Sequence, residues 1–226
     1  MIDIHTHILP NMDDGSKDVD ESNQLLKILE NEGVKLVCLT SHFYPNKESI
    51  DDFLIRRDKS FKQLNYQGNI ELRLGSEVHF YYGISTSEDI EKLCIDGTNL
   101  LLLEMPFDCK FNDNVINEIL TIRNRGIRII LAHIERYDVN EEILRTLKSG
   151  GIYIQVNTES FLGYFKGRRS INWFRQGFID FIGSDSHNTK DRKPNYLKAI
   201  EILSKKFGEA SVNNFIENCY IMLDKR

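Results

Sequence analysis

Short apolar runs, many of them rich in β-branched residues, alternate along the whole chain with longer segments of helical periodicity. Strands are predicted at 1–6, 34–40, 70–75, 99–104, 127–132, 152–157 and 179–183. Helices are predicted at 18–32, 48–66, 86–95, 113–125, 140–149, 168–176, 195–206 and 209–222. Repeated alternation indicates parallel strands joined by crossover helices, and continuously apolar strands are typical of a sheet buried on both faces. The sequence therefore predicts an α/β fold.

Residue types that bind metal ions stand at the ends of six of the seven predicted strands, and the seventh ends in Gln155-Val-Asn157. An open sheet concentrates its site at one switch point, whereas a barrel brings all its carboxyl ends to a common mouth. Because no linker or repeat marks a boundary, we predict one domain over residues 1–226, a TIM-like (βα)7 barrel. The strand-end residues are His5, His7, His42, Glu77, Glu104, His133, Asp185 and His187.

The first and last predicted strands carry ligand types at the same spacing. His5 and His7 are two residues apart, so on a strand both side chains leave the same face. Asp185 and His187 repeat that spacing. Although a lone His-x-His pair can be structural, its place at a strand end favours a metal site. Nitrogen and carboxylate ligands without thiolates suit Mn²⁺, Fe²⁺ or Zn²⁺, whereas Ca²⁺ and Mg²⁺ prefer oxygen alone.

Carboxylates elsewhere allow two interpretations. Glu77 and Glu104 end apolar strands, where an unpaired buried carboxylate is costly; a metal ion is the simplest partner and an arginine is the alternative. In Asp13-Asp14-Gly, an Asp-Gly turn is the favoured interpretation for Asp13, and Asp14 can serve both as turn residue and as ligand.

His79 is the one histidine not placed in the predicted site. A surface or packing role is favoured for it over a contact with the site or its substrate.

Composition bounds the function. The formal net charge of −5 argues against a nucleic-acid groove. None of the four cysteines has an arginine six residues later, and no Gly-x4-Gly-Lys-Ser/Thr motif is present, which disfavours a thiolate phosphatase and a P-loop enzyme. Neither a signal-peptide apolar region nor a run of roughly 20 apolar residues occurs. We expect a cytoplasmic protein with reduced cysteines and no membrane span.

Basic residues gather near the predicted site. Arg136 and Arg192 each follow a predicted ligand within five residues, and Lys166, Arg168 and Arg169 lie in one short segment. Local positive charge beside a metal site suits an anionic substrate. Arg136 and Arg192 are our candidates for forked contacts to phosphoryl oxygens, with surface salt bridges as the alternative. Arg168 and the neighbouring segment with Tyr164 and Phe165 are candidates for contacting the substrate chain. An ordinary solvated loop would account for the same residues equally well.

Several segments together carry a family resemblance. The most specific is M-I-D-I-H-T-H-I-L-P-N-M-D-D-G-S at the start, followed in order by T-S-H-F, G-S-E-V, L-L-E-M-P, L-A-H-I-E-R-Y, Q-V-N and F-I-G-S-D-S-H-N. The chain thereby resembles the polymerase-and-histidinol-phosphatase (PHP) superfamily nearly end to end. More narrowly, it resembles the bacterial PHP-type protein-tyrosine phosphatases of capsule and exopolysaccharide gene clusters. One departure is Ile134, where many relatives have proline.

The resemblance implies a distorted (βα)7 barrel with three divalent metal ions, of which Mn²⁺ is favoured and Fe²⁺ or Zn²⁺ are alternatives. Glu77 would bridge the first and second ions, and Asp14 rather than Asp13 would be the ligand of the third. The implied sets are His5, His7, Glu77 and Asp185 for the first ion, Glu77, Glu104 and His133 for the second, and Asp14, His42 and His187 for the third.

The implied reaction is metal-assisted hydrolysis of phosphotyrosine. Because a tyrosine leaving group has a pKa near 10, little acid catalysis is needed, and His42 or a metal-bound water is the candidate for any that occurs. The resemblance also implies a partner, an autophosphorylating bacterial tyrosine kinase that controls capsular or exopolysaccharide synthesis. A small-molecule phosphatase, such as one for histidinol phosphate, and a non-catalytic kinase-binding scaffold are the alternatives; a PHP exonuclease is disfavoured by the acidic balance.

Overall fold

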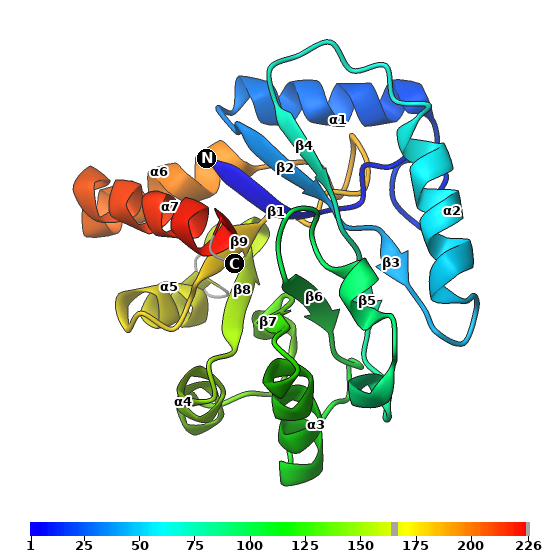
Figure 1. The fold of residues 1–226 in the computed structure, drawn as a ribbon. Coiled ribbons are helices and arrows are strands. Elements are labelled where there is room, and N and C mark those ends of the chain that lie inside the picture. Colours follow the sequence, from blue (N-terminus) through cyan, green and yellow to red (C-terminus); the bar gives the residue numbers. More distant parts are fainter. Residues whose placement is uncertain (164–166, 225–226) are drawn as a thin grey trace.

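The computed structural model describes residues 1–163 and 167–224 and shows a curled parallel sheet with helices around its outside (Figure 1). Every strand pairing is parallel, in two hydrogen-bonded parts of order β1-β2-β4 and β3-β5-β6-β7-β8-β9. The α/β class and the parallel arrangement are therefore confirmed, in the form of a half-barrel. The strands are β1 (Ile2–Thr6), β2 (Leu36–Leu39), β3 (His42–Phe43), β4 (Glu71–Leu74), β5 (Glu77–His79), β6 (Leu100–Glu104), β7 (Arg128–Leu131), β8 (Tyr153–Asn157) and β9 (Phe181–Gly183).

Two predicted strands break near their carboxyl ends. The chain leaves the first part of the sheet after β2 and after β4, and it re-enters the second part as β3 and β5. In the new register His42 lies opposite Glu77, and His79 lies opposite Glu104. The break therefore places these four side chains side by side at one edge.

The first and last strands meet through a short seam. The His7 N–H donates to the Ser186 carbonyl at 2.9 Å, and the Asp185 N–H donates to the His5 carbonyl at 2.8 Å. Asp3 strengthens the seam, because its Oδ1 accepts the Ser184 N–H at 2.8 Å. The seam brings the two ligand pairs of the sequence, nearly the whole chain apart, to the same place.

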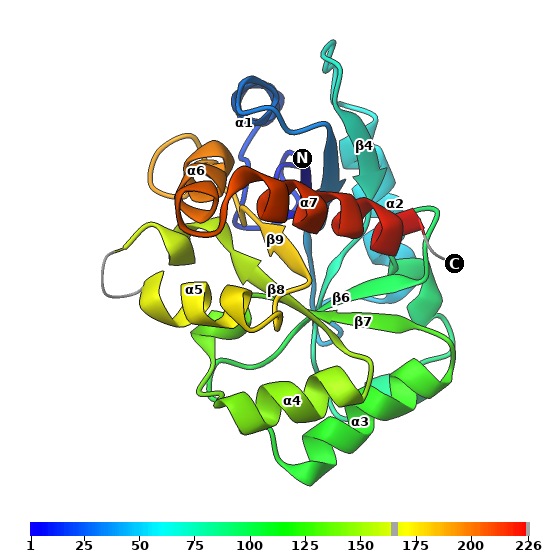
Figure 2. The same ribbon diagram turned by 90° about the vertical axis from the view of Figure 1, so that its left-hand side faces the viewer.

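Seven α-helices are described, and four of them start with a side-chain cap. Asp18, Ser49, Asn112 and Asn140 each accept the backbone N–H of the residue three positions later, the preferred way to satisfy a helix start. Figure 2 shows α6 and α7 side by side on one side of the sheet, and α7 contacts β1. The helices are α1 (Val19–Asn31), α2 (Ile50–Phe61), α3 (Asp113–Asn124), α4 (Glu141–Ser149), α5 (Gly167–Arg175), α6 (Tyr196–Phe207) and α7 (Glu209–Asp224).

The helix predicted at 86–95 is wrong, and the one predicted at 48–66 is too long. Two 3-10 turns, Ile84–Thr86 and Ile90–Leu93, occupy the first region. Its buried residues Ile84 and Ile90 are separated by a polar stretch of serine, threonine and acidic residues, which compete with the helical backbone for hydrogen bonds. In the second region α2 ends at Phe61, before the turn that leads into β4.

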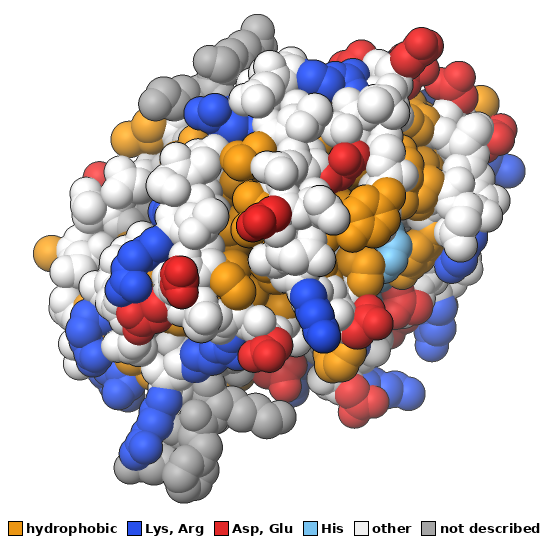
Figure 3. Space-filling model, turned by 90° about the horizontal axis from the view of Figure 1, so that it is seen from below, with side chains coloured by type: hydrophobic (Ala, Val, Ile, Leu, Met, Phe, Trp, Pro, Cys, Tyr) orange, Lys and Arg blue, Asp and Glu red, His pale blue; other side chains and the backbone are white. Residues whose placement is uncertain are grey.

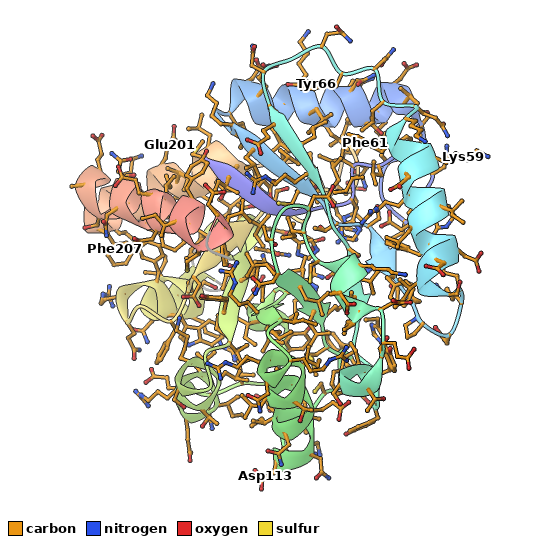
Figure 4. All side chains as sticks on the ribbon, in the orientation of Figure 1. Lys59, Phe61, Tyr66, Asp113, Glu201 and Phe207 are labelled. Carbon is orange, nitrogen blue, oxygen red and sulfur yellow. The ribbon has the colours of Figure 1, made fainter. Side chains whose placement is uncertain are left out.

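Apolar side chains fill the space between helices and strands, and many charged side chains outside the site lie on the surface (Figure 4). The labelled Lys59 and Asp113 are exposed on the outer faces of α2 and α3. Cys38 and Cys94 are buried and form no disulfide. Burial raises the pKa of the Cys94 thiol to about 12, so this cysteine stays protonated.

Gly183 gives a test of the seam. A Cβ at this position would lie 2.6 Å from the His5 Cβ and 3.0 Å from the Gln155 Nε2. Because β1 and β8 have little room to move apart, Gly183→Ala is expected to lower the free energy of unfolding by about 1–3 kcal/mol, the usual cost of overpacking. Urea denaturation measures this, with Ser211→Ala on exposed α7 as control. Equal stability of the two variants would contradict a tightly packed seam.

Candidate metal centre

All nine predicted ligands gather at the carboxyl ends of the strands. Their nitrogen and oxygen atoms form four overlapping groups, and within each group the ligand atoms lie no more than 4.8 Å apart. The overlap arises because His5, His7, His42 and Glu77 each belong to two groups. The groups are His5, His7 and Asp185; His5, Glu77 and His133; His42, Glu77 and Glu104; and His7, Asp14, His42 and His187.

Potential metal-ligand atoms of His5, His7 and Glu77 lie close together at the centre of the cluster. The Nε2 atoms of His5 and His7 lie 3.1 Å apart, and the Glu77 Oε2 lies 3.2 Å and 3.1 Å from them. Ligands about 2.1 Å from one ion lie roughly 3.0–3.5 Å from each other. The spacing and the nitrogen–oxygen donor set therefore fit a divalent transition-metal ion.

Glu77 connects the groups. Its Oε1 lies 2.8 Å from the His133 Nε2, and its Oε2 lies 3.0 Å from the His42 Nδ1. The side chain is 1% exposed, and among the described residues Oε2 has no well-aligned hydrogen-bond donor. Burial alone would raise the pKa of Glu77, but the imidazoles of His5 and His42 hold it well below its usual range. A buried carboxylate with an unused oxygen is suited to bridging two cations.

The third group forms the open side of the cluster. The Asp14 Oδ1 lies 3.5 Å from the His187 Nε2 and 3.6 Å from the His42 Nε2, and the Asp14 side chain is 63% exposed. His7 also belongs to this group, although the resemblance assigns it to the first ion only. His7 therefore lies close to residues of both the first and the third implied set.

Asp13 does more than form the turn favoured for it. Its Oδ2 lies 2.8 Å from the His7 Nδ1 and accepts the His42 N–H at 2.8 Å, while its Oδ1 accepts the Gly15 N–H at 3.0 Å. A carboxylate behind one ring nitrogen fixes the orientation and tautomer of an imidazole, so the other nitrogen is free to bind a metal. The turn interpretation is therefore incomplete, because the Asp13 side chain, which is 5% exposed, also positions His7.

Strand β8, the one predicted strand without a metal-binding residue at its end, supplies further groups that position the ligands. The Gln155 Oε1 lies 3.1 Å from the His5 Nδ1 and accepts the His133 N–H at 2.7 Å. The Asn157 Nδ2 donates to the Asp185 Oδ2 at 2.8 Å. Sequence reasoning missed both roles. The signal was present in the Q-V-N spacing, which directs two amides to the same face of β8.

Two predicted ligands have unusual backbone conformations. His133 and Asp185 have φ values of 33° and 52°, and Asn11 is the only other non-glycine residue with positive φ in the described ranges 1–163 and 167–224. Left-handed backbone is unfavourable for side chains with a Cβ and is concentrated at functional sites. The strain is evidence that the cluster is a site rather than a structural salt-bridge network.

Both predicted phosphate-binding arginines contact Asp185. Arg136 donates to its Oδ2, and the Arg192 Nη2 lies 3.0 Å from both of its oxygens. The Arg192 Nη1 also lies 3.5 Å from the Asp14 Oδ2. Burial would raise the pKa of Asp185, but His5, His7 and Arg136 hold it well below its usual range. The two guanidinium groups therefore border the cluster, 39% and 38% exposed.

The other basic and aromatic candidates lie differently. Arg168 lines a separate pocket with Ile171, Arg175 and Lys206 that contains none of the nine ligands. Tyr164, Phe165 and Lys166 lie outside the described residues.

His79 is not a simple packing residue. Its Nδ1 lies 3.2 Å from the Glu104 Oε2, and its side chain is 33% exposed. Figure 3 shows hydrophobic side chains beside a histidine that reaches the surface on the face seen from below. Tyr82 and Phe107 are among the exposed large hydrophobic residues. The packing interpretation is therefore incomplete, since His79 contacts a predicted ligand.

The arrangement has counterparts in known proteins. A family model described as capsular polysaccharide synthesis, CpsB/CapC, matches residues 1–224. The chain belongs to this family. No helix among the described residues is both long enough and apolar enough to cross a membrane.

Several relatives of the chain carry the name tyrosine-protein phosphatase. CpsB of Streptococcus pneumoniae is 29% identical over 238 residues, which cover 96% of this chain and 96% of that protein. YwqE of Bacillus subtilis is 28% identical over 244 residues, which cover 99% of this chain and 91% of that protein. These alignments run through nearly the whole chain, as the sequence resemblance does.

Solved structures share the fold. A crystal structure from work on YwqE of Bacillus subtilis and CpsB of Streptococcus pneumoniae, described as unique metal-dependent tyrosine phosphatases, matches with a TM-score of 0.82. The sequence identity is 25%, and the match covers 100% of this chain and 95% of that one. A histidinol phosphate phosphatase from Lactococcus lactis matches with a TM-score of 0.56 at 17% identity, over 91% of this chain and 92% of that one. The second match shows a similar fold alone.

Proposed function

We propose that this protein is a metal-dependent protein-tyrosine phosphatase. The observation that carries the proposal is the Glu77 cluster, in which imidazoles and carboxylates converge on one another with two arginines at the rim. Such a cluster is costly to bury without cations. The relatives named as tyrosine phosphatases, and the metal-dependent phosphatase structure at a TM-score of 0.82, support the reaction class.

Three divalent ions, preferably Mn²⁺ and otherwise Fe²⁺ or Zn²⁺, would be bound by the nine ligands in the sets implied above. When bound, they supply an activated water and positive charge for the phosphoryl group. We also propose that β2 with β3, and β4 with β5, each count as one broken strand. The sheet would then be a distorted seven-stranded barrel, closed by the seam between β1 and β9.

Arg136 and Arg192 would orient the phosphoryl group. Each guanidinium carries five N–H donors in a planar fork that matches phosphate oxygens, and each reaches solvent at the rim. Both contact Asp185, so they stand directly beside the metal ligands. An anionic substrate would therefore meet fixed positive charge as it approaches, which lowers the cost of bringing phosphate to a carboxylate-rich site.

The leaving group needs little help from the protein. A phenol has a pKa near 10, so its oxygen leaves more readily than that of an alkyl alcohol. Both ring nitrogens of His42 face carboxylates, Glu77 and Asp14, which favours its role as a ligand over its predicted role as proton donor. Phosphotyrosine is thus a chemically reasonable substrate for a site built for charge rather than for acid catalysis.

The natural substrate would be an autophosphorylating tyrosine kinase of the cytoplasm, in keeping with the capsular polysaccharide synthesis named for the family. Arg168 on α5 would contact the flanking chain of that kinase. Both remain predictions.

Phosphate release tests the proposal. The holoenzyme is given a phosphotyrosine peptide, the matching phosphoserine peptide or histidinol phosphate, each with Mn²⁺ and with chelator. We expect release from phosphotyrosine that depends on the metal and exceeds the others at least about tenfold in kcat/KM. A preference for histidinol phosphate would replace the substrate class, and metal binding without any turnover would leave a kinase-binding scaffold.

A further inference from the structure

A polar pocket adjoins the metal centre between β8 and α5. Its volume is about 510 Å³, within the range of specific ligand sites. Two of its residues touch the centre directly, because Arg136 and Asn157 both donate to the Asp185 Oδ2. None of the nine ligands lines it. The lining includes Glu135, Arg136, Asn157, Glu159, Arg169 and Ser170.

Two buried polar atoms of this pocket lack partners. The Ser170 side chain is 1% exposed, and within the described residues neither its hydroxyl nor the Glu135 Oε2 has a hydrogen-bond partner. The other Glu135 oxygen is held in place, because it accepts the Asn157 N–H at 3.0 Å. Leaving buried polar groups unpaired costs about 1–3 kcal/mol each. Buried polar groups without partners are rare in native proteins, so these two residues of the pocket call for a partner.

Arg169 supplies a fixed donor on the same wall. Its guanidinium lies over the Trp173 ring, 4.3 Å from the centroid, and its Nη2 donates to the Tyr137 and Val139 carbonyls. Stacking and carbonyl contacts hold the group in one orientation. A guanidinium has five N–H groups, so donors are left for a ligand after these contacts.

The charge pattern limits what the ligand can be. Glu135 and Glu159 bring carboxylates into the pocket beside Arg136 and Arg169. A second phosphate would meet repulsion from these carboxylates, and an apolar side chain would leave the buried hydroxyl and carboxylate unpaired. A peptide group, with one N–H donor and one carbonyl acceptor, is complementary to such a mixed wall.

We propose that this pocket binds the polypeptide backbone next to the phosphotyrosine. The Glu135 Oε2 accepts a backbone N–H of the substrate, and Ser170 and Arg169 donate to the adjacent carbonyl. The pocket thereby makes the enzyme prefer phosphotyrosine within a protein over a free aryl phosphate. This inference rests on the proposed phosphatase function and specifies its substrate class.

The test compares two substrates on the Mn²⁺-loaded enzyme, a phosphotyrosine peptide and phenyl phosphate. Ser170→Ala and Arg169→Gln are each expected to lower the peptide-to-phenyl-phosphate ratio of kcat/KM about tenfold, as for the loss of one hydrogen bond. Arg175→Gln, on the same helix but lining another pocket, is the matched control and should keep the ratio. Thermal melting checks that each variant is folded.

The possible outcomes distinguish failure of the peptide-binding pocket from failure of the proposed phosphatase function. An unchanged ratio in both variants, or an equal loss on both substrates, would overturn the peptide pocket while leaving the phosphatase intact. If the unsubstituted protein released phosphate from neither substrate, the proposed function would fail instead. Fluorescence anisotropy of the labelled phosphotyrosine peptide would then decide the pocket, since weaker binding by Ser170→Ala supports it and unchanged binding overturns it.

Discussion

Glu77→Gln is expected to abolish metal-dependent phosphate release. The substitution keeps the shape of the side chain but removes the charge that connects His5, His42 and His133. Loss of a residue that merely orients a ligand lowers metal affinity or activity by about 10–100-fold. Because Glu77 belongs to two of the four ligand groups, we expect a decrease in kcat/KM greater than about 100-fold, accompanied by fewer bound ions per chain.

The measurement has two parts, phosphate release and metal content by mass spectrometry after exchange into metal-free buffer. Glu142→Gln is the control, since it makes the same chemical change on the exposed face of α4. Circular dichroism would show whether the variant retains its helices. If Glu77→Gln kept its full metal content, Glu77 would not bridge two ions, whatever the effect on the rate of phosphate release.

Arg136→Lys has the second-largest expected effect, on activity without loss of metal. Lysine keeps the charge but not the planar fork, so forked contacts to a phosphoryl group are lost. Removal of one preorganised donor commonly costs about 10²–10³-fold in kcat. We expect that decrease for phosphotyrosine peptide and phenyl phosphate alike, because both carry the same phosphoryl group.

Metal content distinguishes a contact with the substrate from support of Asp185. Arg136 donates to Asp185, so a purely structural role would appear as altered metal binding with a matching loss of rate. Arg145→Lys, which alters an exposed pair with Glu141, is the control. Normal turnover by Arg136→Lys would refute the assignment and leave Arg192 as the candidate for this contact.

The gathering of the nine residues could be predicted because metal sites use few residue types, and parallel strands bring their carboxyl ends together. Apolar runs located the strands, and histidine or carboxylate at six of the seven strand ends marked the mouth. Asp14 is the exception, since its choice over Asp13 came from the resemblance. The structure gathers all nine, and the exposed Asp14 lies at the edge of the cluster as one of its four groups.

The supporting groups could not be predicted, because their roles depend on hydrogen bonds between segments far apart in sequence. Gln155 is a common residue type, and only the fold brings its amide to His5 and His133. Asp13 looked like a turn residue because local spacing says nothing of the imidazole behind it. The helix predicted at 86–95 failed for a local reason. The serine, threonine and acidic residues at 85–89 compete with the helical backbone for hydrogen bonds, and only a 3-10 turn forms at Ile90–Leu93.

The seam between β1 and β9 also determines when, during synthesis of the chain, the cluster can form. His7 and His187 are separated by 180 positions, and the hydrogen bonds that join their strands involve residues 5, 7, 185 and 186. At roughly 5–20 residues per second, a ribosome makes the second half of this pair about ten to forty seconds after the first. During that interval β1 can pair with β2, but His5 and His7 lack the segment that carries Asp185 and His187. The complete cluster therefore forms only late in biogenesis, and a chain truncated before residue 185 cannot assemble it.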